Sequence, residues 1–198
     1  MIHAVVFDLG EVLASPPSLL PDLARRLGVE EEALSMRYWD GRVGYDAGCP
    51  AIDYWGPILE DLGVEPTDAL VEEIAGLDAA GWTELRSTAR QLLRDVRGSG
   101  VSVAVLTNSP HAMQKAADAA AWRREVNHLF VSATVGMTKP DPDLYRHVAA
   151  RLGLDPQQIA YIDDNPANVA AAVELGWRGH VFTTDAATRV WLVGLGVL

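Results

Sequence analysis

Several charged residues of the sequence follow apolar runs and have side chains that suit phosphate chemistry. Asp8 follows one apolar run, the adjacent pair Asp163 and Asp164 follows another, and Lys139 stands directly before a proline. Two neighbouring carboxylates repel each other and lose hydration on burial, so such a pair favours a cation or a positioned lysine beside it. Three acids and one lysine at the ends of strands therefore predict a metal-assisted phosphate site.

The elements that must position these residues follow from the pattern of the chain. Strand-like runs occur at 2–7, 101–106, 128–132, 159–162 and 180–182, and helical patterns occur at 88–96, 111–122, 143–152 and 166–175. This alternation predicts an α/β fold with a doubly wound, mostly parallel five-stranded sheet of the Rossmann-like type. The carboxyl ends of its strands deliver Asp8, Thr107 and Asp163 to one crevice.

The long interval after the first strand has no strand pattern. It favours four amphipathic helices, at 17–27, 31–39, 50–62 and 67–77. We expect an α/β core domain of residues 1–14 and 88–198 and a helical cap domain of residues 15–87. Ligands of doubly wound sheets bind beyond the carboxyl ends of the strands, so this insertion would cover the site.

Composition excludes several classes of function. Sixteen Lys and Arg against 27 Asp and Glu give a net charge of −11 without a basic cluster, which argues against nucleic-acid binding. The single cysteine excludes an intramolecular disulfide and a cysteine metal cluster. We find no apolar stretch of membrane-spanning length and no charged leader before the first strand, so we expect a cytoplasmic protein without a membrane partner.

Four short motifs occur in order: FDLGEVL at 7–13, LTNS at 106–109, KPD at 139–141 and DDNPAN at 163–168. Together they cover nearly the whole chain, and the chain resembles the haloacid dehalogenase-like hydrolase superfamily. The resemblance implies that Asp8 attacks phosphorus to form an aspartyl-phosphate, which water then hydrolyses. It also implies that Thr107 binds a phosphate oxygen through its hydroxyl and Asn108 through its backbone N–H. Lys139 would neutralise the charge of the nucleophile and of the transferring group.

The resemblance further implies Mg²⁺ as the cofactor, bound by Asp8, the backbone carbonyl of Gly10 and Asp164. Asp163 would act through water or anchor Lys139. Phosphoryl transfer needs distributed positive charge, and Mg²⁺ prefers a few carboxylates with water in the remaining positions. The expected function is a Mg²⁺-dependent hydrolase that removes phosphate from a small phosphorylated metabolite.

Gly10 departs from the pattern of this superfamily, where most phosphatases have a second aspartate as general acid and base. Such proton transfer is worth on the order of 10² to 10⁴ in rate. Three alternatives stay open: a slower phosphatase, a replacement acid such as Glu11, or a catalytically weak scaffold that binds phosphometabolites. A 2-haloacid dehalogenase is a further alternative, but similar dehalogenases usually have neutral residues in place of Asp163 and Asp164.

Aromatic residues of the insertion could form either its core or a substrate face, and the core is favoured for most of them. They are Tyr38, Trp39, Tyr45, Tyr54 and Trp55. The apolar segment 190–195 could similarly pack on the sheet or form a homodimer contact.

Overall fold

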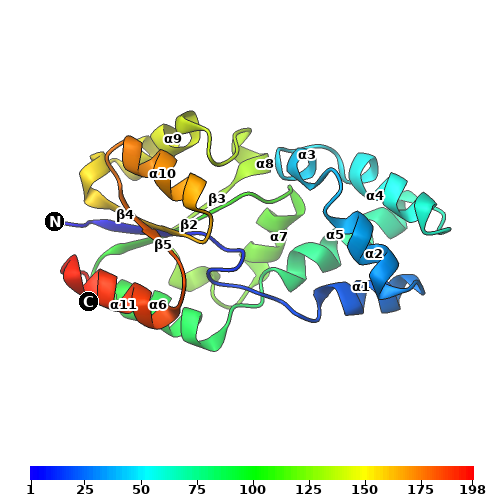
Figure 1. The fold of residues 1–198 in the computed structure, drawn as a ribbon, viewed down its shortest axis with the longest axis horizontal. Coiled ribbons are helices and arrows are strands. Elements are labelled where there is room, and N and C mark those ends of the chain that lie inside the picture. The colour runs from blue at the N-terminus through cyan, green and yellow to red at the C-terminus, as the bar shows by residue number, and fades with distance from the viewer.

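The computed structural model describes all 198 residues, and its framework is a five-stranded, all-parallel sheet (Figure 1). The strands lie in the order β3-β2-β1-β4-β5. They are β1 (Ala4–Phe7), β2 (Ser102–Thr107), β3 (His128–Val131), β4 (Ile159–Asp163) and β5 (Arg178–Val181). The predicted α/β sheet is confirmed. Phe7, the last residue of β1, pairs with Val105 of β2 and Ile162 of β4, so the neighbouring strands end side by side.

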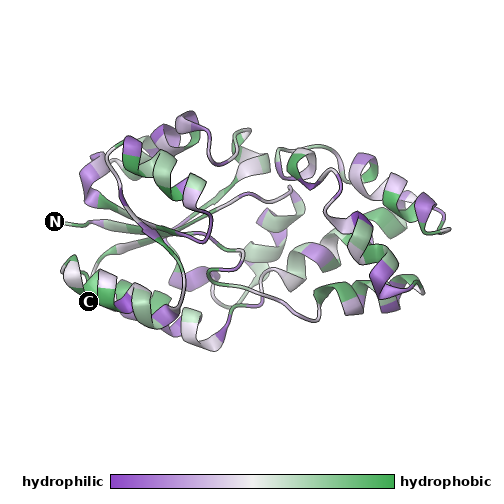
Figure 2. Cartoon of the chain, viewed as in Figure 1, coloured by the Kyte–Doolittle hydropathy of each residue, from purple (hydrophilic) through white to green (hydrophobic).

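Helices cover both faces of the sheet because its side chains alternate between two buried clusters. Val5 and Phe7 pack in one cluster, and Val6 packs in the other. The first cluster is covered by α6 (Ser87–Gly98), α7 (Ala112–Ala119) and α11 (Asp185–Gly194), and the second by α9 (Pro142–Leu152) and α10 (Pro166–Glu174). Figure 2 shows that the helices of both layers alternate between apolar and polar residues along their length. The connections also contain α8 (Ser132–Val135) and two 3₁₀ turns, η1 (Arg123–Glu125) and η2 (Pro156–Gln158).

A helical insertion separates β1 from α6 and lies to one side of the sheet (Figure 1). It consists of α1 (Leu19–Leu27), α2 (Glu31–Tyr38), α3 (Arg42–Asp46), α4 (Ala51–Asp61) and α5 (Asp68–Gly81). Its buried side chains form a separate cluster. The prediction of four helices was incomplete, because the five residues of α3 are too few to display a helical apolar period.

The two segments that join the insertion to the sheet domain run against each other. Ala14 forms an antiparallel bridge with Leu85, and the backbone N–H of Arg86 donates to the carbonyl of Leu13 over 3.0 Å. The chain therefore enters and leaves the insertion through one short hydrogen-bonded ribbon, and α5 of the insertion also packs against α7 of the sheet domain. No helix of the structure combines the length and the apolar character needed to cross a bilayer.

Most of the aromatic residues of the insertion are core residues. Tyr38, Tyr45, Tyr54 and Trp55 are buried in the cluster of the insertion, whereas Trp39 is 59% exposed. The core interpretation is thus correct for four of the five.

The segment 190–195 belongs largely to α11, whose Leu192 is buried in the sheet core while Val190 and Val193 are exposed. Strand β5 begins at Arg178, earlier than predicted, because this half-exposed edge strand lacks the apolar run used to locate it.

Candidate functional site

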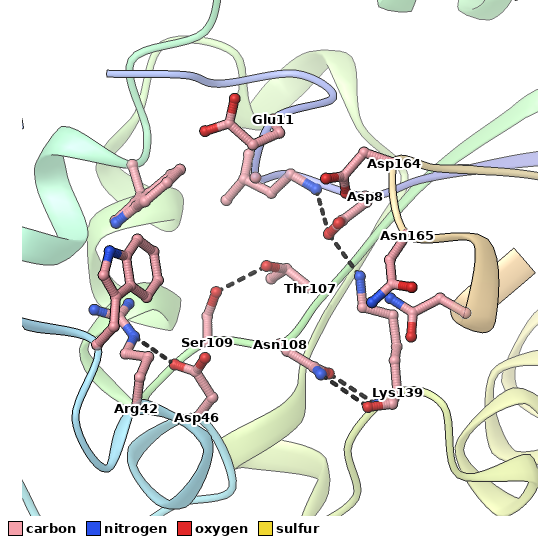
Figure 3. Close-up of a pocket in the computed structure, with 15 residues that line it drawn as sticks. Asp8, Glu11, Arg42, Asp46, Thr107, Asn108, Ser109, Lys139, Asp164 and Asn165 are labelled. Atoms are coloured by element: carbon pink, nitrogen blue, oxygen red, sulfur yellow. Dashed lines mark hydrogen bonds and ion pairs between the residues drawn. The ribbon is translucent and has the colours of Figure 1, made fainter. Parts of the chain in front are cut away.

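Lys139 connects the ends of two strands by ion pairs. Its Nζ lies 2.7 Å from Oδ1 of Asp8, after β1, and 2.7 Å from Oδ2 of Asp163, the last residue of β4. All three residues are buried. Asp8 Oδ1 also accepts a hydrogen bond of 2.7 Å from the backbone N–H of Leu9. Figure 3 shows the side chain of Lys139 extending toward Asp8. The predicted convergence of these residues is therefore present.

Asp163 has several further hydrogen-bond donors around its carboxylate. Oδ1 accepts from the backbone N–H of Asn165 at 2.8 Å and from Nδ2 of Asn168 at 3.0 Å. Oδ2 accepts from the hydroxyl of Tyr161 in addition to Lys139. Because both oxygens are engaged and the residue is fully buried, this carboxylate is built to fix the lysine.

Asp164 differs from its neighbour because it is exposed to the crevice. Helix α10 is capped by Asn165, whose side chain accepts from the N–H of Ala167, so Asp164 is not needed as a helix cap. Carboxylate oxygens of Asp8, Asp163 and Asp164 all lie within 4.8 Å of one another. Oxygen ligands around one Mg²⁺ ion lie about 2 Å from the metal, so this group fits a divalent cation after small movements.

The charges of this cluster support the same fit. Three carboxylates face one ammonium group, which leaves an excess of negative charge that a divalent ion would neutralise. The carbonyl of Gly10, the fourth predicted metal ligand, accepts a hydrogen bond of 2.6 Å from the N–H of Val12. A carbonyl oxygen has two lone pairs, so this bond leaves one free for a metal.

Burial dominates the electrostatics of the site. It raises the pKa of Asp8 to about 7, while the ammonium of Lys139 acts in the opposite direction. Burial alone would lower the pKa of Lys139, but the charges of Asp8 and Asp163 outweigh it and raise that pKa. The pKa of Asp164 is also raised, by burial and by the negative charge of Asp163. The lysine thus keeps its positive charge beside the strand ends.

The loop after β2 provides hydroxyl and amide groups. The hydroxyls of Thr107 and Ser109 lie 2.7 Å apart, and both residues line the cavity. Asn108 binds the backbone of Lys139 in both directions: its Oδ1 accepts from the N–H of Lys139 at 2.8 Å, and its Nδ2 donates to the carbonyl at 3.0 Å. This pair of bonds fixes the loop that carries the lysine, a role that the sequence does not indicate.

A cavity of about 320 Å³ lies over these strand ends and is closed by residues of the insertion. Arg42 and Asp46 of α3 line it together with Trp39 and Trp82. In Figure 3, Arg42 and Asp46 lie across the cavity from Asp8 and Asp164. Nothing in the sequence marks Arg42, Asp46 and Trp82 as residues of the site, because charged residues in a short helix and a lone tryptophan carry no signal of their position.

Arg42 is part of a buried charge cluster in the insertion. Its Nε lies 3.0 Å from Oδ1 of Asp46, and its Nη1 lies 3.2 Å from Oδ2 of Asp78 and 2.6 Å from the hydroxyl of Tyr38. Asp78 is fully buried. Burial raises the pKa of Asp46 to about 6, with Arg42 opposing the shift. The guanidinium is thus already paired on the side of the insertion.

The insertion is also connected to the loop that follows β2. The hydroxyl of Ser132, at the start of α8, donates to the backbone carbonyl of Asp46 over 2.5 Å. The same oxygen accepts from the N–H of Ser109 over 2.8 Å. One buried hydroxyl therefore connects α3 of the insertion to the loop that follows β2.

The turn after Asp8 has an unusual backbone. Glu11 has φ of 53°, the one positive φ outside glycine, and its carboxylate accepts from the hydroxyl of Ser15 at 2.8 Å. Gly10 does not require glycine for its conformation, since its φ lies outside the left-handed region. A Cβ placed there would lie 3.7 Å from Cζ3 of Trp82, an ordinary contact.

Comparison with known proteins agrees with this architecture. The haloacid dehalogenase-like hydrolase family model matches residues 2–176. The chain is 30% identical to Flavin mononucleotide hydrolase 1 of Arabidopsis thaliana over 54% of its own length and 44% of that protein, so it spans less than half of this relative. It is 28% identical to Phosphatase MT3486 of Mycobacterium tuberculosis, over 95% of this chain and 90% of the relative. It is also 25% identical to (S)-2-haloacid dehalogenase 4A of Burkholderia cepacia, over 89% and 81%.

Among solved structures, a HAD family enzyme of Bacteroides thetaiotaomicron in complex with magnesium and inorganic phosphate has the same fold. Its TM-score is 0.70 at 21% identity, covering 92% of this chain and 95% of that one. The family match extends over all four motifs and over most of the chain. The chain therefore belongs to the haloacid dehalogenase-like hydrolase family, with a helical insertion between β1 and β2.

Proposed function

We propose that this protein is a Mg²⁺-dependent phosphatase that removes phosphate from a small phosphorylated molecule through an aspartyl-phosphate on Asp8. The observation that carries the proposal is the cluster of Asp8, Lys139, Asp163 and Asp164 at the base of a cavity of about 320 Å³. A buried ammonium between carboxylates and an adjacent cation site suit a phosphoryl group better than a neutral substrate.

The first half of the reaction is a displacement at phosphorus. A carboxylate oxygen of Asp8 forms a bond to phosphorus while the bond between phosphorus and the ester oxygen breaks. Lys139 offsets the negative charge that gathers on Asp8 and on the phosphoryl oxygens. The hydroxyl of Thr107 donates to a phosphoryl oxygen, and the backbone N–H of Asn108 binds another. Asp163, held by its own donors, keeps the lysine in place.

The second half returns the free enzyme. Water attacks the phosphorus of the aspartyl-phosphate, the bond to Asp8 breaks, and inorganic phosphate leaves. Asp8, Asp164 and the Gly10 carbonyl would hold Mg²⁺, with Asp163 behind them, and the bound ion supplies positive charge to the phosphoryl oxygens. Gly10 has no side chain to give a proton to the leaving alcohol, so we propose that turnover depends strongly on the leaving group.

Similar proteins support the reaction class. Two of the relatives are described as a phosphatase and as a flavin mononucleotide hydrolase. One relative is an (S)-2-haloacid dehalogenase, whose name indicates a reaction at a carbon–halogen bond. The acidic pair at Asp163 and Asp164 favours the phosphatase, because a site for a metal-free, carboxylate-bearing substrate gains nothing from two further negative charges.

Phosphate release from p-nitrophenyl phosphate tests this proposal. We expect turnover that requires Mg²⁺, stops with excess EDTA, returns when Mg²⁺ is restored, and disappears in Asp8→Asn. Asp22→Asn, which removes an exposed carboxylate of α1, is the matched control and keeps full activity. Absence of Mg²⁺-dependent turnover across a broad panel of phosphate esters would reject the phosphatase. Chloride release from 2-chloropropionate would instead favour the dehalogenase.

A further inference from the structure

The cavity over Asp8 shares part of its wall with a second cavity, whose lining is different. This second cavity measures about 260 Å³ and shares Glu11, Trp39 and Trp82 with the first. Beyond these three residues its wall is formed largely by the segment that enters the insertion, including Pro16, Leu20 and Pro21. The two indoles thus border both the cavity over Asp8 and a neighbouring space lined in part by proline and leucine side chains.

The indole of Trp39 is the main apolar surface that this arrangement leaves open. Its neighbour Tyr38 is fully buried in the insertion, but Trp39 is 59% exposed and lines both cavities. Trp82 is held in place by a hydrogen bond of 2.9 Å from its Nε1 to the hydroxyl of Tyr38. One indole is thus fixed, while the other offers its surface to whatever enters the cavity.

Charge in the two cavities argues against a second anionic group on the substrate. The only cations of the lining are Lys139 and Arg42, and each is already paired with two carboxylates. Further carboxylates line the walls at Glu11 and Glu31. A carboxylate or second phosphate on the substrate would meet uncompensated negative charge.

The second cavity offers a sugar few free hydrogen-bond partners. The carboxylate of Glu11 accepts from the hydroxyl of Ser15, and the hydroxyl of Tyr38 is bonded to Arg42 and Trp82, so Glu31 is the main polar group left. A polyhydroxylated ligand needs a partner for each buried hydroxyl, which one carboxylate does not supply. An apolar group gains free energy where it contacts the proline, leucine and indole side chains, because it leaves water.

We propose that the substrate of this site is the phosphate monoester of an uncharged, carbon-rich alcohol, whose hydrocarbon part lies between Trp39, Trp82 and the 16–21 segment. This inference rests on the proposed phosphatase function and adds the chemical class of the leaving group. The alcohol carries no second anionic group, and few of its atoms beyond the ester oxygen need hydrogen bonds.

The test is kcat/KM for a series of n-alkyl phosphates from ethyl to octyl, with Mg²⁺. Leaving-group basicity is nearly constant along this series, so a change in kcat/KM reports the contact with the hydrocarbon. We expect a rise of about two- to fourfold per methylene, the upper value corresponding to complete burial, until the chain extends beyond the cavity. Hexyl phosphate should also exceed glucose phosphate and glycerol phosphate.

Two variants test whether the gain in kcat/KM per methylene comes from contact with the cavity wall. Trp39→Ala should reduce the gain per methylene, because it removes the exposed indole wall. Val43→Ala is the control, since Val43 is 82% exposed on the same insertion and lines neither cavity, and its gain per methylene should equal that of the unmodified protein.

The outcomes that overturn the inference are distinct from failure of the phosphatase itself. A flat series, a preference for glucose phosphate, or a preference for 2-aminoethyl phosphate over ethyl phosphate would leave a phosphatase whose leaving group is of another class. If the gain in kcat/KM per methylene is unchanged in Trp39→Ala, the hydrocarbon does not lie against Trp39 as proposed. Absence of turnover for every ester would reject the proposed function, and this inference with it.

Discussion

Replacing Gly10 by aspartate should add the proton donor that this site lacks. The backbone at Gly10 lies outside the left-handed region, and a Cβ there would lie 3.7 Å from Trp82, so an aspartate can be built without a backbone clash. The new carboxyl would stand among Asp8, Glu11 and Asp164, which line the same cavity. Neighbouring negative charges raise the pKa of an acid, which favours the protonated form needed to donate to a leaving alcohol.

The size of the effect depends on the leaving group. For an alkyl phosphate, whose alkoxide must be protonated, we expect Gly10→Asp to raise kcat/KM by about 10² to 10⁴. This corresponds to about 3 to 5 kcal/mol of activation free energy. For p-nitrophenyl phosphate, whose phenolate leaves without a proton, the gain should stay below about tenfold.

The assay compares kcat/KM for ethyl and p-nitrophenyl phosphate in the unmodified protein, Gly10→Asp and Gly10→Asn. The asparagine variant has the same shape but cannot donate an acidic proton, so it separates proton transfer from packing. Thermal unfolding of all three proteins checks that the fold is intact. Equal changes for the two esters, or equal changes in the Asp and Asn variants, would refute the reasoning. No gain at all would mean that another residue, such as Glu11 or Asp46, already donates the proton.

Three other predictions follow from the contacts around the site. Asn108→Ala removes both hydrogen bonds to the backbone of Lys139. We expect kcat for p-nitrophenyl phosphate to fall by up to about 100-fold, because the lysine is then positioned less well. An unchanged kcat would contradict the positioning role. Arg42→Met leaves Asp78 buried without its cation and should lower the free energy of unfolding, measured in urea, by about 3 to 5 kcal/mol. Adding Asp78→Leu to the same chain should restore part of this loss, because it removes the unpaired buried charge. Asp46 has a pKa raised from 3.8 to about 6, so between these values the folded protein binds a proton that the unfolded chain releases. The free energy of unfolding should therefore fall by at most about 3 kcal/mol as pH rises through this window. Urea unfolding measured from pH 4 to 7 tests this, and Asp46→Asn should lack this part of the pH dependence. If the variant has the same pH dependence as the unmodified protein, Asp46 is not its source.

The parts of the fold and site that the sequence predicted are those set by short-range patterns. Asp8 and Asp163 follow apolar strands, and parallel topology alone places the ends of adjacent strands together. The position of Lys139 could be expected from the motif that contains it. Apolar runs likewise located β1 to β4 closely, whereas β5, a half-exposed edge strand, begins two residues before its predicted start.

The remaining features depend on contacts between distant segments. Nothing near Asn108 in sequence indicates that its amide binds the backbone of a residue 31 positions away. Arg42 and Asp46 have the composition of a solvated surface turn, and their burial results from packing against Asp78. Trp39 and Trp55 belong to similar helical patterns, yet one lines the cavity and the other is buried, because burial depends on which face meets the rest of the insertion.

The ribbon formed by Ala14 with Leu85 and by Leu13 with Arg86 has a mechanical consequence. Two strands bonded side by side bend readily across their flat face and resist shearing past each other, since shear breaks the bonds between them. Because α5 also packs against α7 and Ser132 holds the backbone of Asp46, opening of the insertion must break these contacts as well as bend the ribbon. We therefore expect bending at these few residues to set the direction of the movement and the broken contacts to set its free-energy cost.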